Sequence, residues 1–188
     1  MTGLLGLATR VLRPLEPLFA RLDRLAGGRA AGRLVPEEMR DHPRTVRSLE
    51  GIAWILVAEV VVGLVAIVIA IVLAAHGEEV DWAVWFRSIA VLAITATLLY
   101  FAWRASLGRY WAYSRLRLFS RIFPVVTLVI AAIPGLYPLW MTVEQIVFSL
   151  LMIGIGDLLT TDHMRAAFPR RPAEPPSADP GRGGTITS

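Results

Sequence analysis

One apolar stretch constrains what the rest of this chain can fold into. It runs from Ile52 to Ala75, reads IAWILVAEVVVGLVAIVIAIVLAA, and contains one ionisable side chain, that of Glu59. A helix rises about 1.5 Å per residue, so a stretch of this length crosses the roughly 30 Å hydrocarbon core of a bilayer. A buried helix of a soluble protein seldom needs such a length. The stretch therefore predicts a membrane-spanning helix.

Three shorter apolar stretches follow, at approximately residues 83–103, 122–137 and 143–159. The composition agrees with a membrane protein, since 55% of the residues are hydrophobic and 18% are charged. The last two stretches are short for a full crossing, so tilt, local thinning of the bilayer or helical extension of the preceding link are all open. We expect an all-α fold: an integral membrane four-helix bundle formed by residues 51–159.

The distribution of arginine predicts the orientation of these spans. All 19 basic residues are arginine, which is typical of a high-GC genome. Nine lie in residues 1–50, five in residues 104–121 and four after residue 160, whereas the turns at residues 76–82 and 134–142 have none. Short cytoplasmic loops carry the excess of positive charge. We therefore expect a multi-pass protein of the bacterial inner membrane with both termini in the cytoplasm.

Residues 1–50 are predicted to form a cytoplasmic amphipathic arm. Apolar residues recur at gaps of three and four, arginines fall mostly on the other face, and Pro14 and Pro17 interrupt the helix. Such an arm could lie in the headgroup plane of the membrane. Alternatively, it is poorly ordered and docks its leucines on the membrane domain or on a second subunit. Residues 160–188 are expected to be a cytoplasmic, mostly disordered tail, because from Ala173 onward they have little to bury.

Glu59 is the first candidate for a functional residue. It lies about 10 Å into its span by helix rise, where an ionised carboxylate is costly unless it is paired or hydrated. One interpretation is structural: Glu59 pairs with Arg104 or Arg121, or donates a hydrogen bond as a neutral acid. The other is functional, a carboxylate that takes up a proton or a cation on a transport path. Tyr100 shares a helix face with Arg104 near the same end of the bundle.

Two further groups of residues are candidates for contacts. Asp157 lies near the cytoplasmic end of the fourth span, where helix packing is its expected role. An arginine and aromatic cluster between the second and third spans could bind anionic lipid headgroups or a partner protein, or could simply fix the topology. Its members are Arg109, Trp111, Arg115 and Arg117.

Other partners and chemistries find little support in the sequence. The arginines lie beside apolar spans, where lipid headgroups explain them, so we expect no nucleic acid partner. The acidic turn at residues 76–82 matches no defined metal motif, and we expect neither a metal nor a cofactor. Cysteine is absent, and no GxSxG, Walker A, HExxH or CxxC pattern occurs.

Two parts of the sequence resemble known families. The stretch AWILVAEVVVG at residues 53–63 is similar to the first helix of small multidrug resistance transporters, in which a glutamate binds a proton and a cationic drug in turn; the resemblance implies that role for Glu59. The arm and the arginine bias depart from that family. As a whole, residues 51–168 resemble small uncharacterised four-helix membrane proteins of high-GC bacteria, through GRYWAYSRLR, PGLYPLW and DHMRAAF. That likeness implies no known activity.

The sequence therefore favours a membrane protein without catalytic activity of its own. The expected role is structural or accessory, as an interaction subunit of a membrane assembly or as a homo-oligomer. The alternative is a small proton-coupled transporter or channel subunit that uses Glu59.

Overall fold

The structure, a computed structural model, describes residues 3–28, 32–133 and 137–169. Within these ranges the chain is helical, and its only extended pairing is an isolated bridge between Leu34 and Arg109. The helices are α1 Leu4–Leu12, the 3₁₀ turn η1 Arg13–Leu15, α2 Glu16–Gly27, α3 Glu37–Arg40, α4 Pro43–Ala75, α5 Trp82–Ser106, α6 Tyr110–Ala131, α7 Leu139–Thr160 and α8 Asp162–Ala167.

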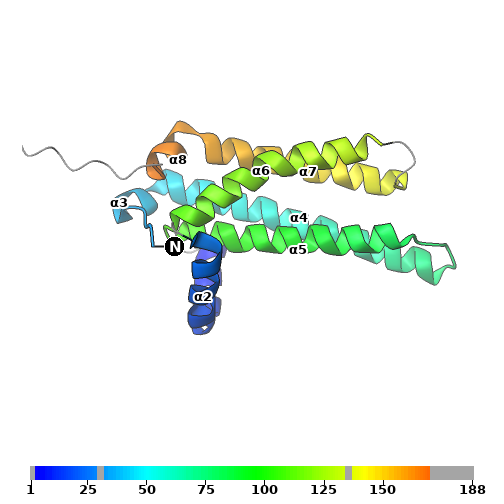
Figure 1. The fold of residues 1–188 in the computed structure, drawn as a ribbon, viewed down its shortest axis with the longest axis horizontal. Coiled ribbons are helices and arrows are strands. Elements are labelled where there is room, and N and C mark those ends of the chain that lie inside the picture. The colour runs from blue at the N-terminus through cyan, green and yellow to red at the C-terminus, as the bar shows by residue number, and fades with distance from the viewer. Residues whose placement is uncertain (1–2, 29–31, 134–136, 170–188) are drawn as a thin grey trace, which may run out of the picture.

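Four long helices, α4 to α7, lie side by side and alternate in direction (Figure 1). Consecutive helices pack against each other, and α4 also packs against α7. Three of them, α4, α5 and α7, are long and apolar enough to cross a membrane. These three helices are compatible with a membrane protein. The remaining long helix, α6, carries Arg115 and Arg117 in its first half and Arg121 at its middle.

The long helices continue beyond the apolar stretches. Helix α4 begins at Pro43, a residue suited to the first helical position, and His42 caps it by accepting a hydrogen bond from the Arg44 backbone N–H at 3.2 Å. Helix α6 begins at Tyr110, so most of the arginine-rich link is helical, which was one of the alternatives for the short third span. The chain turns just before it at Gly108, whose φ of 79° favours glycine.

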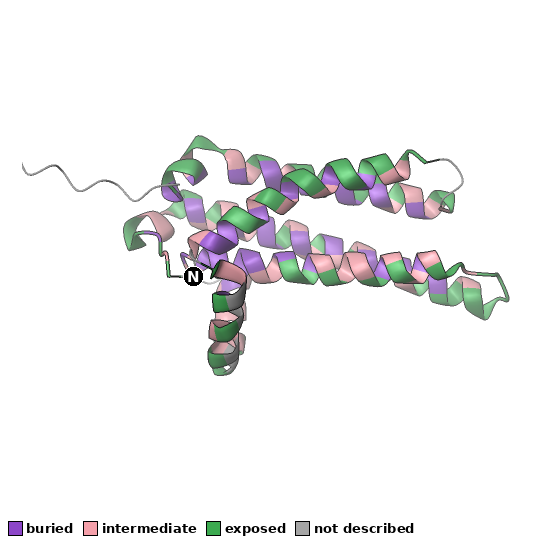
Figure 2. Cartoon of the chain, in the orientation of Figure 1, coloured by how far each residue is buried: buried purple, intermediate pink, exposed green. Residues whose placement is uncertain are grey.

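The four long helices bury one stripe each and expose the rest. Leu56, Leu98, Leu116 and Met152, one from each helix, are all buried in a single core. Figure 2 shows buried residues where the helices face one another and exposed residues along their outer sides. The exposed sides are rich in large aliphatic side chains, which a soluble protein rarely gathers over such a length.

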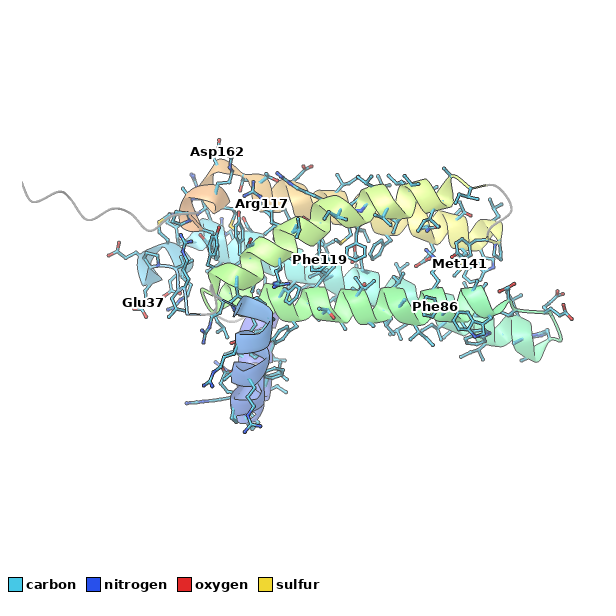
Figure 3. The ribbon with its side chains drawn as sticks, viewed as in Figure 1. Glu37, Phe86, Arg117, Phe119, Met141 and Asp162 are labelled. Atoms are coloured by element: carbon cyan, nitrogen blue, oxygen red, sulfur yellow. The ribbon has the colours of Figure 1, made fainter. Side chains whose placement is uncertain are left out.

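The two ends of the helical bundle differ in character. One end holds α3, α8, the last turn of α5 and the first half of α6, and we call it the arginine-rich end. Figure 3 places Glu37 and Asp162 at this end and Met141 and Phe86 toward the opposite end. Phe168, just after α8, is buried there and stacks on Tyr113 with 4.2 Å between ring centroids. The tail expected to be disordered from residue 173 lies outside the described residues.

The first part of the arm predicted over residues 1–50 folds into α1, η1 and α2, with the interruption at Pro14, and its second part contains α3 and the start of α4. From here on, the arm means α1, η1 and α2. Figure 1 shows α2 running across the long axis of the bundle, not along it. Leu5 of α1 is buried, and α1 packs against α4 and α5. The described part of the arm is therefore docked on the bundle.

Candidate functional site

A buried cluster of charges joins the arm to the arginine-rich end. The Arg104 side chain is fully buried near the end of α5. Its Nε donates to Asp23 Oδ1 at 2.9 Å, its Nη2 donates to Asp23 Oδ2, and its Nη1 donates to Glu16 Oε1 at 2.9 Å. The Tyr100 hydroxyl also donates to Asp23 Oδ1, at 2.9 Å. We call these four residues the arm cluster.

Aromatic contacts cover part of the arm cluster, in which the Arg104 and Asp23 side chains are 0% and 4% exposed and the Glu16 side chain is 45% exposed. Phe19 of α2 packs against Tyr100 and Trp103, with ring centroids 5.5 and 5.1 Å apart. The Trp103 Nε1 donates to Thr9 Oγ1 at 3.0 Å. A buried guanidinium is tolerated only when its donors are satisfied, and the two carboxylates of α2 satisfy Arg104. The cluster thus fixes the position of the arm on α5.

The sequence contains a signal for this cluster, although Glu16 and Asp23 were not among the predicted site residues. They are seven residues apart, a spacing that puts two side chains on one face of a helix. The arm has no other acidic residue between positions 3 and 28. Two acids on one face of an arm rich in arginine predict a contact with a basic residue elsewhere in the fold.

Glu59 does not pair with either arginine proposed for it. Arg104 is engaged by the arm cluster, and Arg121 is exposed on α6. The Glu59 residue is 3% exposed, and neither of its carboxyl oxygens has a hydrogen-bond partner among the described residues. The predicted Glu59–arginine pair is therefore wrong, because the arm supplies the partners of Arg104.

Helix register places other buried polar side chains at the depth of Glu59. Gly51 of α4 lies opposite Leu158 of α7, whose Cδ1 would be 3.9 Å from a Cβ at that glycine. Counting eight residues along each of the two antiparallel helices from this contact brings Glu59 level with Leu150, the neighbour of Ser149. The Ser149 Oγ lies 2.6 Å from Thr127 Oγ1 of α6.

Helix α5 contributes to the same level. Leu92 of α5 lies opposite Gly63 of α4, with its Cδ1 3.6 Å from a Cβ at that glycine. Counting four residues along each helix from this contact brings Glu59 level with Ala96, the neighbour of Thr95. Each of the four long helices thus contributes one buried polar side chain to what we call the polar layer: Glu59, Thr95, Thr127 and Ser149.

The polar layer has unused hydrogen-bonding capacity. Thr95 and Ser149 donate to backbone carbonyls of their own helices, at 3.0 and 2.8 Å, which leaves their oxygens able to accept. Gln145, one turn from Ser149 toward the opposite end, is 1% exposed, and its Oε1 has no partner among the described residues. The Glu59 carboxyl group can therefore bind or release a proton, and the hydroxyl oxygens of the layer remain able to accept hydrogen bonds.

A second buried ion pair lies near the opposite end. Arg87 Nη1 of α5 is 2.7 Å from Glu144 Oε2 of α7, and both side chains are nearly buried. The Arg87 guanidinium also lies 5.3 Å from the centre of the Tyr137 ring. The sequence did not reveal this pair, because each residue taken alone is close enough to the predicted boundary of its span to reach water.

The remaining candidates fall outside these sites. Asp157 is exposed on α7, and the described residues offer it no hydrogen-bond or ion-pair partner. Trp111 is 2% exposed and packs edge-on against Phe101 at 5.6 Å, so its predicted contact with lipid or a partner is wrong. Trp111 lies in the first turn of α6 and belongs to the core that α6 shares with α5.

The three arginines of the predicted arginine and aromatic cluster have different environments. Arg115 is exposed and Arg117 is half-buried on α6. Arg109 lies 3.9 Å from Asp23, at the edge of the arm cluster. Within the described ranges, no group of three or more His, Cys, Asp or Glu side chains is arranged to hold a metal ion.

No protein-family model, curated protein or solved structure matches this chain. A function must therefore be inferred from the residues described above.

Proposed function

We propose that the chain is an integral protein of a bacterial inner membrane that crosses it four times, through α4, α5, α6 and α7. Three of these helices have the length and composition of spans, and α6 runs beside them as an antiparallel neighbour of α5 and α7. The arginines gather at the end that holds the arm, so this end and both termini are cytoplasmic. The arm is amphipathic and lies on the cytoplasmic side.

Labelling in intact cells tests this topology, and the chain has no cysteine to interfere. Single variants Glu78→Cys and Asp162→Cys place a thiol in the turn after α4 and in α8. A membrane-impermeant maleimide should label only the first from outside, and both after the cells are opened. Labelling of Asp162→Cys in intact cells would contradict the proposed orientation.

The function that we propose is non-catalytic: a structural or interaction subunit of a membrane assembly. The observation that carries it is the arm cluster, which uses buried charge to fix an extra helical segment on the cytoplasmic end of the spans. These contacts hold the arm rigidly on the end of the bundle that also carries α3 and α8, and we call these three elements the cytoplasmic platform. A rigid platform suits the recognition of a neighbouring subunit.

Purification in a mild detergent with crosslinking tests this function. The wild-type chain should be recovered in a defined oligomer or with a stoichiometric membrane partner. The Arg104→Gln variant should lose that association, whereas Arg115→Gln, a matched change of an exposed arginine, should keep it. A monodisperse wild-type monomer without a partner would contradict the proposal.

Glu59 favours a second candidate, a small proton-coupled transporter or channel subunit. Its carboxyl group is buried and has no hydrogen-bond partner among the described residues, and an ionisable group kept at such a cost inside a span is often a functional one. Proteoliposomes with a pH-sensitive dye inside test this candidate. Glu59→Gln should abolish proton flux that the wild type shows, and Asp157→Asn, which removes an exposed acid, should not. Absence of flux in the wild type would eliminate the candidate.

A further inference from the structure

We propose that the arm is a membrane-surface anchor that binds the headgroups of anionic phospholipids in the cytoplasmic leaflet. The proposal rests on the membrane orientation given above and adds to it a lipid class and a binding surface. Three features of the arm support it: the depth at which it is held, the direction in which it runs, and the charge that it leaves uncompensated.

The arm is held at the depth where the apolar stretch of α4 begins. The backbone N–H groups of Leu4 and Leu5 donate to the Glu50 carboxylate, two residues before Ile52. From α5, Trp103 donates to Thr9 at 3.0 Å, near the cytoplasmic end of that helix. Both contacts place α1 at the boundary between apolar span and polar lead-in, which is the level of the lipid headgroups.

The direction of the arm agrees with this depth. The long helices define the normal of the membrane, and α2 runs across them (Figure 1). A helix perpendicular to the normal at the headgroup level lies in the plane of the interface, as amphipathic membrane-surface helices do.

The exposed face of α1 has the composition of such a helix. Leu7 and Val11, one turn apart on the same face, are 66% and 64% exposed. Arg10 flanks them and is exposed. Apolar side chains beside a long arginine suit the boundary between acyl chains and phosphates, where the guanidinium reaches the phosphate oxygens.

The arm cluster leaves the outer surface of the arm positive. The only acids of the described arm, Glu16 and Asp23, both bind Arg104 of α5. The four arginines within α1, η1 and α2 are exposed, and no acid of the arm remains to neutralise them: Arg10, Arg13, Arg21 and Arg24. Their charge complements anionic phospholipid and not a zwitterionic one.

Retention of lipid by the full-length protein tests the role of this charge. The delipidated protein receives phosphatidylglycerol or phosphatidylcholine, and native mass spectrometry counts the lipids that stay bound. A triple arm variant changes Arg10, Arg13 and Arg21 to Gln. A control variant with the same change of charge has Gln in place of three exposed arginines beyond the arm, Arg44, Arg47 and Arg165. We expect the wild type and the control to prefer phosphatidylglycerol and the arm variant to lose this preference. Equal preference in all three proteins would overturn the proposal.

Spin labels at single introduced cysteines test the depth of the arm in nanodiscs that contain phosphatidylglycerol. Labels at Leu7→Cys and Val11→Cys should be accessible to oxygen and shielded from a water-soluble nickel complex, whereas a label at Glu37→Cys on α3 should show the reverse. Nickel access at both arm positions, in a protein whose spans are inserted, would overturn the anchor and leave the membrane topology intact. A chain that stays in solution without detergent would overturn both.

Discussion

Arg87 and Glu144 form an ion pair inside the bundle, with Nη1 and Oε2 2.7 Å apart. The pair joins α5 to α7, two helices separated in the chain by α6. Their side chains are 11% and 10% exposed, so neither group can keep a full shell of water. The pair therefore holds the end of the bundle opposite the arm.

Breaking this pair on one side should be costly. Glu144→Gln or Arg87→Gln leaves the other charge nearly buried without its partner, and we expect each change to lower the free energy of unfolding by about 3 kcal/mol. The double variant Arg87→Leu with Glu144→Leu should recover much of that loss, because no charge is then stranded. Unfolding in mixed detergent micelles measures all three. An equal loss of unfolding free energy in the single and double variants would show that the cost does not come from a stranded charge.

Removing one charge from the arm cluster, at the arginine-rich end of the bundle, should also be costly. Asp23→Asn removes the charge that Arg104 holds through two nitrogens, and such a loss costs about 3–5 kcal/mol in a buried pair. Only the arm is held by this contact, so the expected result is a released arm and an intact bundle. Trypsin should then cut the arm about 100- to 4,000-fold faster, since each 1.4 kcal/mol is a factor of ten. Asp157→Asn, an exposed acid, should leave the cleavage rate unchanged.

The apolar stretch of α4 and the break in the arm are features that the sequence pattern predicts. The length of the apolar stretch that starts at Ile52 predicts a long helix, and the prolines predict the break in the arm, because length and backbone restriction are local properties. Small residues recur after Glu59 on its own helix face, and of these Gly63, Ala66 and Ala70 are buried whereas Ala74 is exposed.

The partners of the charged residues could not be obtained in this way. Arg104 lies close to Glu59 in the arrangement that the spans predict, and its pairing with Asp23 becomes visible only when α2 is placed across α5. Trp111 was misplaced for a related reason: a helical link was one of the alternatives, but the sequence pattern does not show which side of that helix packs into the core, and Trp111 in the first turn of α6 is buried. Choices among partners depend on the tertiary arrangement, which a periodic pattern does not encode.

Protonation of His163 should weaken the contact between α8 and α4. The His163 ring lies 4.5 Å from that of His42, and its Nε2 is 3.0 Å from Thr45 Oγ1. Burial, followed by the nearby His42 and Arg44, lowers the pKa of His163 below its ordinary value of 6.5.

The folded protein therefore takes up this proton less readily than the unfolded chain does. The contribution of His163 to stability is complete above about pH 6.5 and is lost as the pH falls through that value toward the lower pKa of the folded state. Thermal unfolding at about pH 7.5 and about pH 5 should show a smaller pH dependence in His163→Gln than in the wild type. His76→Gln, at the exposed turn after α4, should keep the wild-type dependence.

Replacing Glu59 should stabilise the protein. A buried carboxyl group without a hydrogen-bond partner costs about 1–3 kcal/mol, and Glu59→Leu removes that cost while filling similar volume. We expect the unfolding temperature to rise, as it often does when a residue kept for function is replaced. A fall of the unfolding temperature in both Glu59→Leu and Glu59→Gln would show that the carboxyl group holds the bundle together, which would count against a role in transport.

Two glycines of α7 should differ sharply in what they tolerate. A Cβ at Gly156 would lie 3.5 Å from the carbonyl oxygen and from the Oγ of Ser120 on α6, whereas a Cβ at Gly154 would meet nothing within 4 Å. Gly156→Ala should therefore be tolerated, but Gly156→Leu should force α6 and α7 apart and cost about 1–3 kcal/mol. Gly154→Leu, the same change two residues away, points to open space and should be neutral or slightly stabilising, since leucine favours a helix more than glycine does. Unfolding of the two leucine variants in the same detergent compares them, and equal stabilities would mean that α6 and α7 do not pack closely at Ser120.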